Sequence, residues 1–115
     1  MLKIYYNPKC KKSREGLKYL QQLGKEFQVI EYLKEGFTID ELKDVLKKLG
    51  KRPHEIIRKQ EEYYKKELKN KNFTDDEWIR IIAENPKIIQ RPIVVGKYKA
   101  IIAQPPELIL KVIAN

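Results

Sequence analysis

The first 33 residues pass from a strand pattern to a helix pattern and back to a strand pattern, and this order limits the possible folds more than any other feature. Apolar and polar residues alternate over positions 2–6, and apolar residues recur at helical spacing from Gly16 to Leu23, before Gly24. Positions 27–33 are rich in β-branched and aromatic residues. A strand, a helix and a strand in this order normally give two parallel strands with a right-handed crossover. The sequence therefore predicts an α/β fold whose site follows the first strand.

The middle of the chain predicts helices. Capping boxes at 38–41 and 74–77 predict two helices, which end at Gly50 and before Pro86. The stretch 52–71 between them, which is strongly charged over 59–71, predicts short helices joined by exposed turns.

The last part of the chain predicts two strands and a helix. Segments 92–95 and 98–103 have strand composition and meet at Gly96-Lys97, which is typical of a hairpin. Pro105-Pro106 suits the start of a final helix. We therefore expect one domain over residues 1–115, with a sheet of about four strands and a helical insertion at about 38–86 between the second and third strands.

Cys10 is the only cysteine and lies between the first strand and the first helix. The positive end of a helix favours an anion, and Lys9, Lys11, Lys12 and Arg14 add positive charge around the thiol. Cysteines in such settings have a lowered pKa and are nucleophilic at neutral pH. We therefore interpret Cys10 as a reactive thiol, and the alternative is a small buried apolar residue.

The composition indicates a globular protein with a strongly basic surface. The formal net charge is +9, from 25 Lys and Arg against 16 Asp and Glu, so anionic partners deserve consideration, although lysine-rich helix faces are also common without a partner. A single cysteine excludes a framework of internal disulfides. With no apolar run long enough for a membrane span, and a strand pattern at the start of the chain, we expect a cytoplasmic protein without membrane contact.

Metal binding and nucleic-acid binding are both disfavoured. His54 is the only histidine, and no second ligand stands at metal-binding spacing, so we expect no metal site. The aromatic residues Tyr63, Tyr64 and Trp78 recur at helical spacing with apolar residues, which favours core packing over base stacking. No nucleic-acid-binding motif accompanies the lysines.

Five segments together resemble one protein family. They are Tyr6 to Arg14 (YNPKCKKSR), Glu31 to Leu33 (EYL), Ile57 to Lys59 (IRK), Phe73 to Asp76 (FTDD), and Asn85 to Val95 (NPKIIQRPIVV). The chain resembles the glutaredoxin-coupled arsenate reductases, a family with a thioredoxin-like fold that also contains the Spx-type transcription regulators.

The resemblance implies a site centred on Cys10. In that family the matching cysteine attacks arsenate, and arginines matching Arg58 and Arg91 hold the oxyanion, as planar guanidinium groups do well. The backbone N–H groups of Lys11, Lys12 and Ser13 are expected to complete an anion nest at the helix start.

The resemblance also implies the supporting residues and the reaction partners. Asn7 is expected to shape the loop beside Cys10, and Pro92 matches the cis-proline position of the fold. The substrate is expected to be arsenate or another small oxyanion. No bound cofactor is expected; instead, glutathione would act as co-substrate and glutaredoxin as a protein partner, because a single cysteine cannot resolve its own adduct.

Two positions depart from the family pattern. Gln104 replaces a third anion-binding arginine, and Tyr6 replaces a histidine four residues before the cysteine. An amide still donates a hydrogen bond but has no charge. The alternative function is that of an Spx-like regulator that contacts RNA polymerase; against it, Ser13 stands where the two-cysteine Spx switch has its second cysteine.

Overall fold

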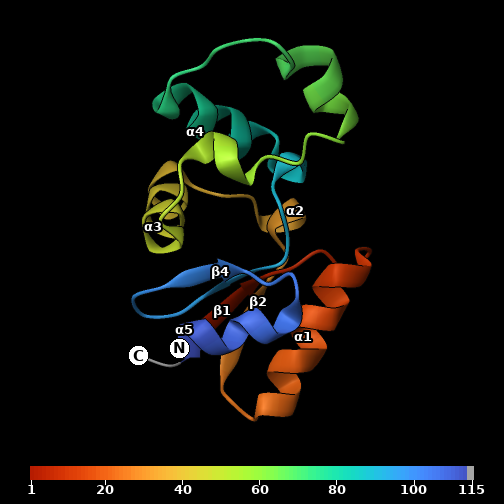
Figure 1. Ribbon diagram of the computed structural model, residues 1–115, viewed down its shortest axis with the longest axis vertical. Helices are drawn as coiled ribbons and strands as arrows, with labels where there is room; N and C mark the ends of the chain where they lie inside the picture. Colours follow the sequence, from red (N-terminus) through yellow and green to blue (C-terminus); the bar gives the residue numbers. More distant parts are fainter. Residues whose placement is uncertain (114–115) are drawn as a thin grey trace. The chain divides into compact units, whose positions relative to one another are not determined.

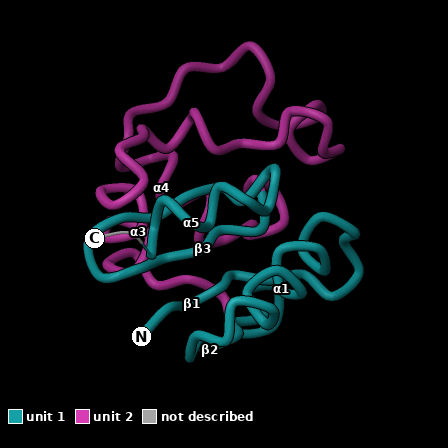
Figure 2. The backbone as a smooth tube through the Cα atoms, turned by 60° about the horizontal axis from the view of Figure 1, so that its bottom comes forward, with its two compact units in different colours: residues 1–35, 91–115 teal, residues 36–90 magenta. Residues whose placement is uncertain are grey.

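The computed structural model describes residues 1–113, which divide into two compact units (Figure 2). The first unit contains Met1–Glu35 and the chain from Arg91 onward, and the second contains Gly36–Gln90. The second unit therefore includes the residues expected as the helical insertion at about 38–86. No helix within the described residues is long and apolar enough to cross a membrane.

A four-stranded mixed sheet forms the centre of the first unit (Figure 1). Its strands are β1 (Leu2–Tyr5), β2 (Phe27–Ile30), β3 (Ile93–Val95) and β4 (Ala100–Ile102). They lie in the order β2-β1-β3-β4, where β1 and β2 are parallel and β3 is antiparallel to both of its neighbours. The predicted α/β fold, with its mixed sheet and helices between the second and third strands, is confirmed.

Two helical segments of the first unit enclose an apolar core with the sheet. Helix α1 (Lys11–Leu23) joins β1 to β2, and the chain after β4 forms the 3-10 helix η4 (Pro106–Ile109) and then α5 (Leu110–Ile113). Helix α1 contacts η4, and α5 contacts β4 (Figure 1). The buried core residues of this unit come from both segments and from the sheet: Ile4, Leu20, Val94, Ala103 and Ile109.

Helix α1 approaches the start of β3 at Gly16. A Cβ atom built on Gly16 would lie 2.7 Å from Cγ of Pro92, which is closer than real Cβ contacts. Only a residue without a side chain fits here, so Gly16 allows α1 to pack directly against the segment that leads into β3.

Two predicted strands are shorter in the structure than in the sequence pattern. The strand expected over 27–33 ends at Ile30, because the chain then turns into the short helix α2 (Tyr32–Glu35). The Glu35 carboxylate accepts a hydrogen bond from the Glu31 N–H at this turn, and the Tyr32 side chain is fully buried. The strand expected over 98–103 begins only at Ala100. The first two expected positions, 98 and 99, belong to the turn before the strand. The Gly96 N–H donates a hydrogen bond to the Lys99 carbonyl at 2.8 Å and closes this turn.

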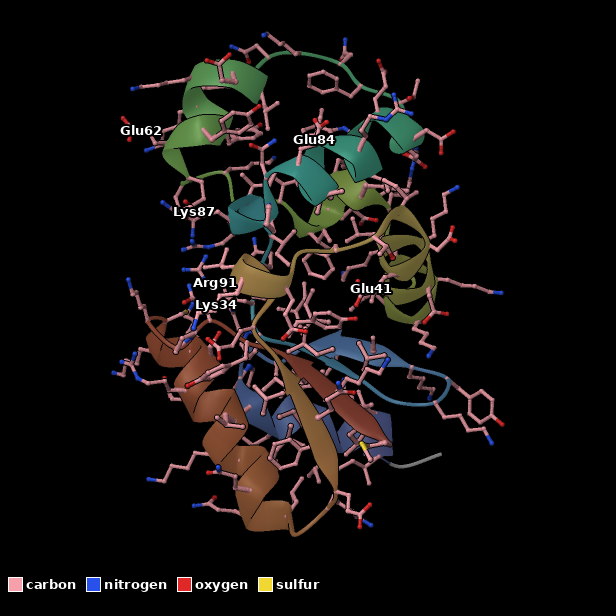
Figure 3. All side chains as sticks on the ribbon, turned by 180° about the vertical axis from the view of Figure 1, so that it is seen from behind. Lys34, Glu41, Glu62, Glu84, Lys87 and Arg91 are labelled. Carbon is pink, nitrogen blue, oxygen red and sulfur yellow. The ribbon has the colours of Figure 1, made fainter. Side chains whose placement is uncertain are left out.

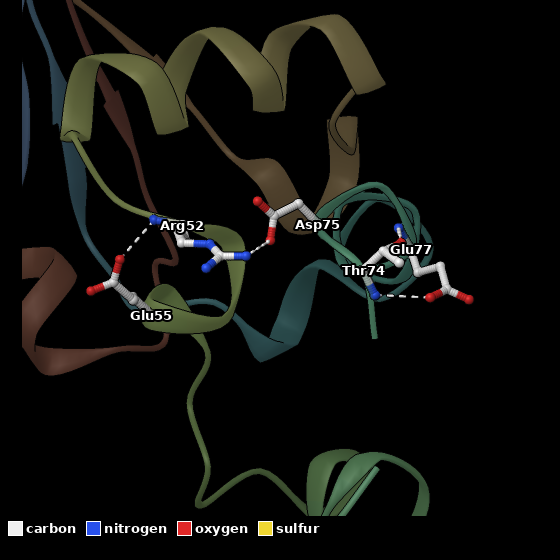
Figure 4. A network of polar contacts seen from close by, with 5 residues as sticks. All are labelled: Arg52, Glu55, Thr74, Asp75 and Glu77. Atoms are coloured by element: carbon white, nitrogen blue, oxygen red, sulfur yellow. Dashed lines mark hydrogen bonds and ion pairs between the residues drawn. The ribbon is translucent and has the colours of Figure 1, made fainter. Parts of the chain in front are cut away.

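Two capped helices organise the second unit, as predicted. Helix α3 (Ile39–Leu49) and helix α4 (Asp75–Glu84) pack against each other, and each begins with a complete capping box. Figure 4 shows the second box, in which Glu77 accepts from the Thr74 N–H at 2.8 Å and Thr74 Oγ1 accepts from the Glu77 N–H at 3.1 Å. These bonds satisfy N–H groups that a helix start otherwise leaves unpaired.

A 3-10 helix, η1 (Pro53–Ile56), contacts α4 and begins at an exposed ion pair. The Arg52 guanidinium donates to Asp75 at 3.1 Å, and the Arg52 N–H donates to Glu55 at 2.8 Å (Figure 4). The ion pair is exposed to solvent and therefore adds little to the stability of the fold.

The charged stretch before α4 contains short helices joined by turns, as expected. A short π-helix, η2 (Tyr64–Leu68), buries Leu68 but leaves the Tyr63 side chain 42% exposed, so core packing was the wrong expectation for Tyr63. The expectation holds for Trp78, which is 8% exposed and meets the Phe73 ring edge-on at 4.9 Å. After α4, the 3-10 helix η3 (Pro86–Ile88) leads towards β3.

Candidate active site around Cys10

Cys10 is the N-cap residue of α1 and follows the loop after β1, as the sequence predicts. The loop is held by its own residues. The Cys10 N–H donates to the Asn7 carbonyl at 3.0 Å, Asn7 Oδ1 accepts from the Lys9 N–H at 3.0 Å, and Arg14 donates to the Pro8 carbonyl at 3.0 Å. The partly exposed thiol therefore lies at the positive end of a 13-residue helix.

Arg91, which is labelled in Figure 3, lies 81 residues after Cys10 in the sequence and brings a guanidinium group to the thiol. Its Nε donates to Cys10 Sγ at 3.3 Å. The residue is placed by the start of β3, where the Arg91-Pro92 peptide bond is cis and Pro92 is buried against Gly16. The antiparallel pairing of β1 with β3 thus places Arg91 beside the loop that follows β1.

The thiol of Cys10 is acidic for a cysteine, and its surroundings explain why. Burial raises its pKa, but the Ser13 N–H, the hydrogen bond and charge of Arg91, and the Lys12 N–H all favour the thiolate and together lower the pKa from 9.0 to about 7. The thiolate is therefore much more populated at neutral pH than in an ordinary cysteine. The group can act as a nucleophile without a separate base.

Gln104 links two of the predicted site residues to each other. Its amide oxygen accepts a hydrogen bond from Lys12 Nζ at 3.2 Å, and its amide nitrogen donates to the backbone carbonyl of Arg91. One neutral side chain thus connects the first turn of α1 with the residue that contacts the thiol.

Ser13 and Lys11 contribute differently to the helix start. Ser13 is fully buried, and its hydroxyl has no hydrogen-bond partner within the described residues; its backbone N–H, by contrast, stabilises the Cys10 thiolate. Lys11 is the first residue of α1 and is exposed. The structure thus brings together Cys10 and Arg91 with the helix start and Gln104.

Arg58 belongs to the second unit and forms an ion pair there. Its N–H donates to the Ile88 carbonyl at 2.6 Å, and its guanidinium pairs with the Glu61 carboxylate three residues later. Both side chains are mostly buried, at 18% and 15% exposed. The charge of Arg58 is therefore balanced within residues 36–90.

A metal centre would need a cluster of metal-ligating side chains. Within residues 1–113, no three or more His, Cys, Asp or Glu side chains are grouped so that they could hold a metal ion. The groups that the structure places at the site are the Cys10 thiol, the Arg91 guanidinium and the N–H groups of a helix start.

Comparison with known proteins places this chain in a family. The model of the ArsC family matches residues 5–112. The chain belongs to the ArsC family. The uncharacterized protein YfgD of Escherichia coli (strain K12) is 40% identical over 97% of this chain and 96% of its own length. An arsenate reductase of Neisseria meningitidis is 37% identical over 92% of each chain.

A solved structure agrees with this ArsC assignment. The arsenate reductase from Vibrio cholerae superposes with a TM-score of 0.90 at 41% identity and covers 96% of each chain. The resemblance to the arsenate reductase family and the thioredoxin-like fold are thereby confirmed.

The structure also describes the surroundings of Gln104 and Tyr6, the two positions where the resemblance implies a departure from the family pattern. Gln104 uses its neutral amide to donate to the Arg91 backbone carbonyl and to accept from the Lys12 ammonium group. Tyr6 is half-buried and packs against the core of the first unit, while its N–H donates to the Ile30 carbonyl at 2.9 Å. Tyr6 therefore has a packing role in this ArsC protein.

Two acidic residues near predicted site residues were missed by the sequence reasoning. Glu61 forms an ion pair with Arg58. The two residues are three positions apart, and this spacing could have predicted the pair from the sequence. Glu15, on α1, lines a cavity together with Lys12 and Gln104. Only the folded chain brings Gln104 to that helix, so no local pattern could have revealed this cavity.

Proposed function

We propose that this ArsC protein is an arsenate reductase that uses Cys10 as its single nucleophile and is coupled to glutathione and glutaredoxin. The observation that carries the proposal is the 3.3 Å contact between Arg91 Nε and Cys10 Sγ. It puts a guanidinium group beside a thiol whose pKa is about 7. Arg91 can thus stabilise the thiolate and attract a tetrahedral oxyanion to the same place.

The proposed reaction begins with attack of the Cys10 thiolate on dihydrogen arsenate. An S–As bond forms, an As–O bond breaks, and the departing hydroxide takes a proton from solvent and leaves as water. The adduct is an anion, and the guanidinium of Arg91 with the N–H groups of Lys12 and Ser13 would stabilise it. Arg58 is proposed as a further oxyanion ligand on the family resemblance alone.

Release of the adduct requires a thiol from outside, because Cys10 is the only cysteine. In the proposed step a glutathione thiol attacks the Cys10 sulfur and forms a disulfide with it. The S–As bond breaks and leaves its electron pair on arsenic, which becomes arsenite, and the thiol proton goes to an arsenite oxygen. A glutaredoxin thiolate then takes over the glutathione and returns the Cys10 thiolate. Reduced glutathione is abundant in the cytosol, which is where we expect this chemistry.

The test is arsenate-dependent oxidation of NADPH in an assay with glutathione, glutaredoxin and glutathione reductase. The wild-type protein should turn over arsenate, and Cys10→Ser should lose turnover while it keeps the unfolding curve of the wild type. Arg91→Ala and Arg58→Ala should each raise KM for arsenate. Turnover by Cys10→Ser would contradict the nucleophile assignment.

An Spx-like regulator is the competing function. Absence of turnover in the wild-type protein, with Cys10 still titrating near pH 7, would favour it or another thiol substrate. The relatives named above as arsenate reductases support the enzyme as the better proposal.

A further inference from the structure

A cavity of about 420 Å³ opens next to the thiol site in the first unit. It is lined by Lys12, Glu15, Ala103, Gln104, Pro105 and Pro106. Two of these residues also belong to the surroundings of the thiol. Lys12 offers its N–H to the Cys10 sulfur, and Gln104 donates to the carbonyl of Arg91. A molecule bound in this cavity would therefore lie beside the reacting sulfur.

The lining of the cavity has one positive and one negative side chain. Lys12 and Glu15 are three residues apart on α1, so they project from the same side of the helix. Gln104 holds the Lys12 ammonium by one hydrogen bond of 3.2 Å, which leaves donors for a ligand. Within residues 1–113, Glu15 takes part in no ion pair.

The remaining lining residues are weakly polar. Ala103, Pro105 and Pro106 present aliphatic surface, and a volume of about 420 Å³ lies in the range of cavities that bind small organic molecules. Such a cavity suits a short flexible molecule with a carboxylate at one end, an ammonium group at the other and an aliphatic part between them.

We propose that this cavity binds the small thiol that resolves the Cys10 adduct, with its carboxylate at Lys12 and its ammonium group at Glu15. The ligand class is an anionic peptide thiol with an ammonium group. Glutathione is the probe, and its glycine carboxylate, which is remote from the ammonium group, is the one placed at Lys12. The inference rests on the proposed function, because an external thiol is needed only if Cys10 forms an adduct. The cavity would raise the concentration of this thiol next to the sulfur and orient it for attack.

The test uses thiol–disulfide exchange, which contains no arsenate. The Cys10 thiolate attacks glutathione disulfide, an S–S bond to glutathione forms, the old S–S bond breaks, and one glutathione leaves as its thiolate. The rate of this reaction is followed by intact mass. Two further disulfides serve as comparison: the uncharged disulfide of mercaptoethanol, and N-acetylated glutathione disulfide, which has no ammonium group.

The variants are Glu15→Gln and Glu15→Lys, with Glu26→Gln and Glu26→Lys as matched controls. Glu26 is also an exposed carboxylate of the first unit but does not line the cavity. Exchange with glutathione disulfide should slow about threefold in Glu15→Gln and roughly tenfold in Glu15→Lys. The rates with the other two disulfides should not fall in either variant, and the controls should not slow with any disulfide.

The sign of the effect makes this experiment decisive. Glutathione disulfide has a net negative charge, so loss of a carboxylate would by itself speed its approach. A slower reaction is therefore expected only if Glu15 binds the ammonium group. Unchanged or faster exchange in Glu15→Lys, or equal slowing with all three disulfides, would overturn the inference. Failure of arsenate turnover with the expected exchange rates would instead contradict the proposed function and leave the thiol site in place.

Discussion

The reactivity of Cys10 depends on one side chain from a distant part of the sequence. Arg91 contributes both a hydrogen bond and a positive charge to the thiolate. The remaining stabilising groups are the N–H groups of Ser13 and Lys12, which any sequence folded into α1 would provide. Replacement of Arg91 should therefore separate the contribution of its side chain to the pKa of Cys10 from the contribution of the helix start.

The first prediction concerns the pH dependence of Cys10. Its alkylation rate with iodoacetamide should rise with pH to half its maximum at about pH 7, because the thiolate forms with a pKa of about 7. In Arg91→Ala the midpoint should move up by roughly one pH unit, because one charge-assisted hydrogen bond is lost. Arg80→Ala removes an exposed arginine on α4 and should leave the midpoint in place. An unchanged midpoint in Arg91→Ala would show that the helix start alone sets the pKa.

The second prediction concerns Gln104, which stands where the family resemblance implies a third arginine. Gln104→Arg should lower KM for arsenate by about tenfold, because a charged donor replaces a neutral one beside Arg91. The new guanidinium can still donate to the Arg91 carbonyl but cannot accept from Lys12. The neutral variant Gln104→Met removes both contacts and should raise KM. Equal KM values in Gln104→Arg and the wild type would mean that Lys12 already supplies the required charge.

At the residue scale, the sequence revealed the centre of the site but not its contacts. Cys10 and its cations were recognisable because the helix start and the charges are local in sequence. Asn7, Arg91 and Pro92 were named through the resemblance to a family. The link from Lys12 through Gln104 to Arg91 joins residues far apart in the chain, so it became visible only in the folded structure.

At the scale of elements, the contact of α1 with the start of β3 ties the packing to the site. Gly16 lies against Pro92, and Arg91 precedes that proline. A change in the distance between α1 and this segment would therefore move the guanidinium relative to the thiol.

The third prediction tests this packing. Gly16→Ala should destabilise the protein by about 1–3 kcal/mol, because the new methyl group overlaps the Pro92 ring. The sign of the change in unfolding free energy is informative, because the same substitution within an unconstrained helix stabilises the protein by about 0.5–1 kcal/mol. Urea unfolding measures the difference, and Lys18→Ala on the exposed side of α1 is the control with little expected effect. A stabilised Gly16→Ala variant would contradict the tight contact.

The elements that were predicted correctly have signals within a few residues. Both capping boxes, at Thr38 and Thr74, were identified because the cap and its glutamate are three residues apart. The second strand was predicted too long because Tyr32 and Leu33 have strand composition, whereas burial of the Tyr32 ring and the Glu35 hydrogen bond form a helical turn. Burial of the Tyr32 ring is a tertiary effect that composition could not show, whereas the Glu31–Glu35 hydrogen bond spans only four residues.

At the scale of the whole molecule, the net charge of +9 favours the approach of anions to the thiol. Lys9, Lys11, Lys12 and Arg14 surround Cys10 in the sequence, so the positive charge is concentrated where the proposed substrate must arrive. Electrostatic attraction over this distance depends on salt, because the Debye length falls from about 30 Å at 0.01 M to about 10 Å at 0.1 M ionic strength.

The last prediction compares two alkylating reagents that differ in charge. The anionic iodoacetate should react with Cys10 faster at low salt, and its rate should fall roughly tenfold as the ionic strength rises, because salt screens the basic surface. The neutral iodoacetamide should react at nearly the same rate throughout, since it gains nothing from the positive charge and reports only the thiolate fraction. The ratio of the two rates therefore isolates the attraction of the anion from the change in the pKa of Cys10. A ratio that does not depend on salt would mean that the lysines around Cys10 are only a solvated surface, and that Arg91 and the helix start alone favour the anion.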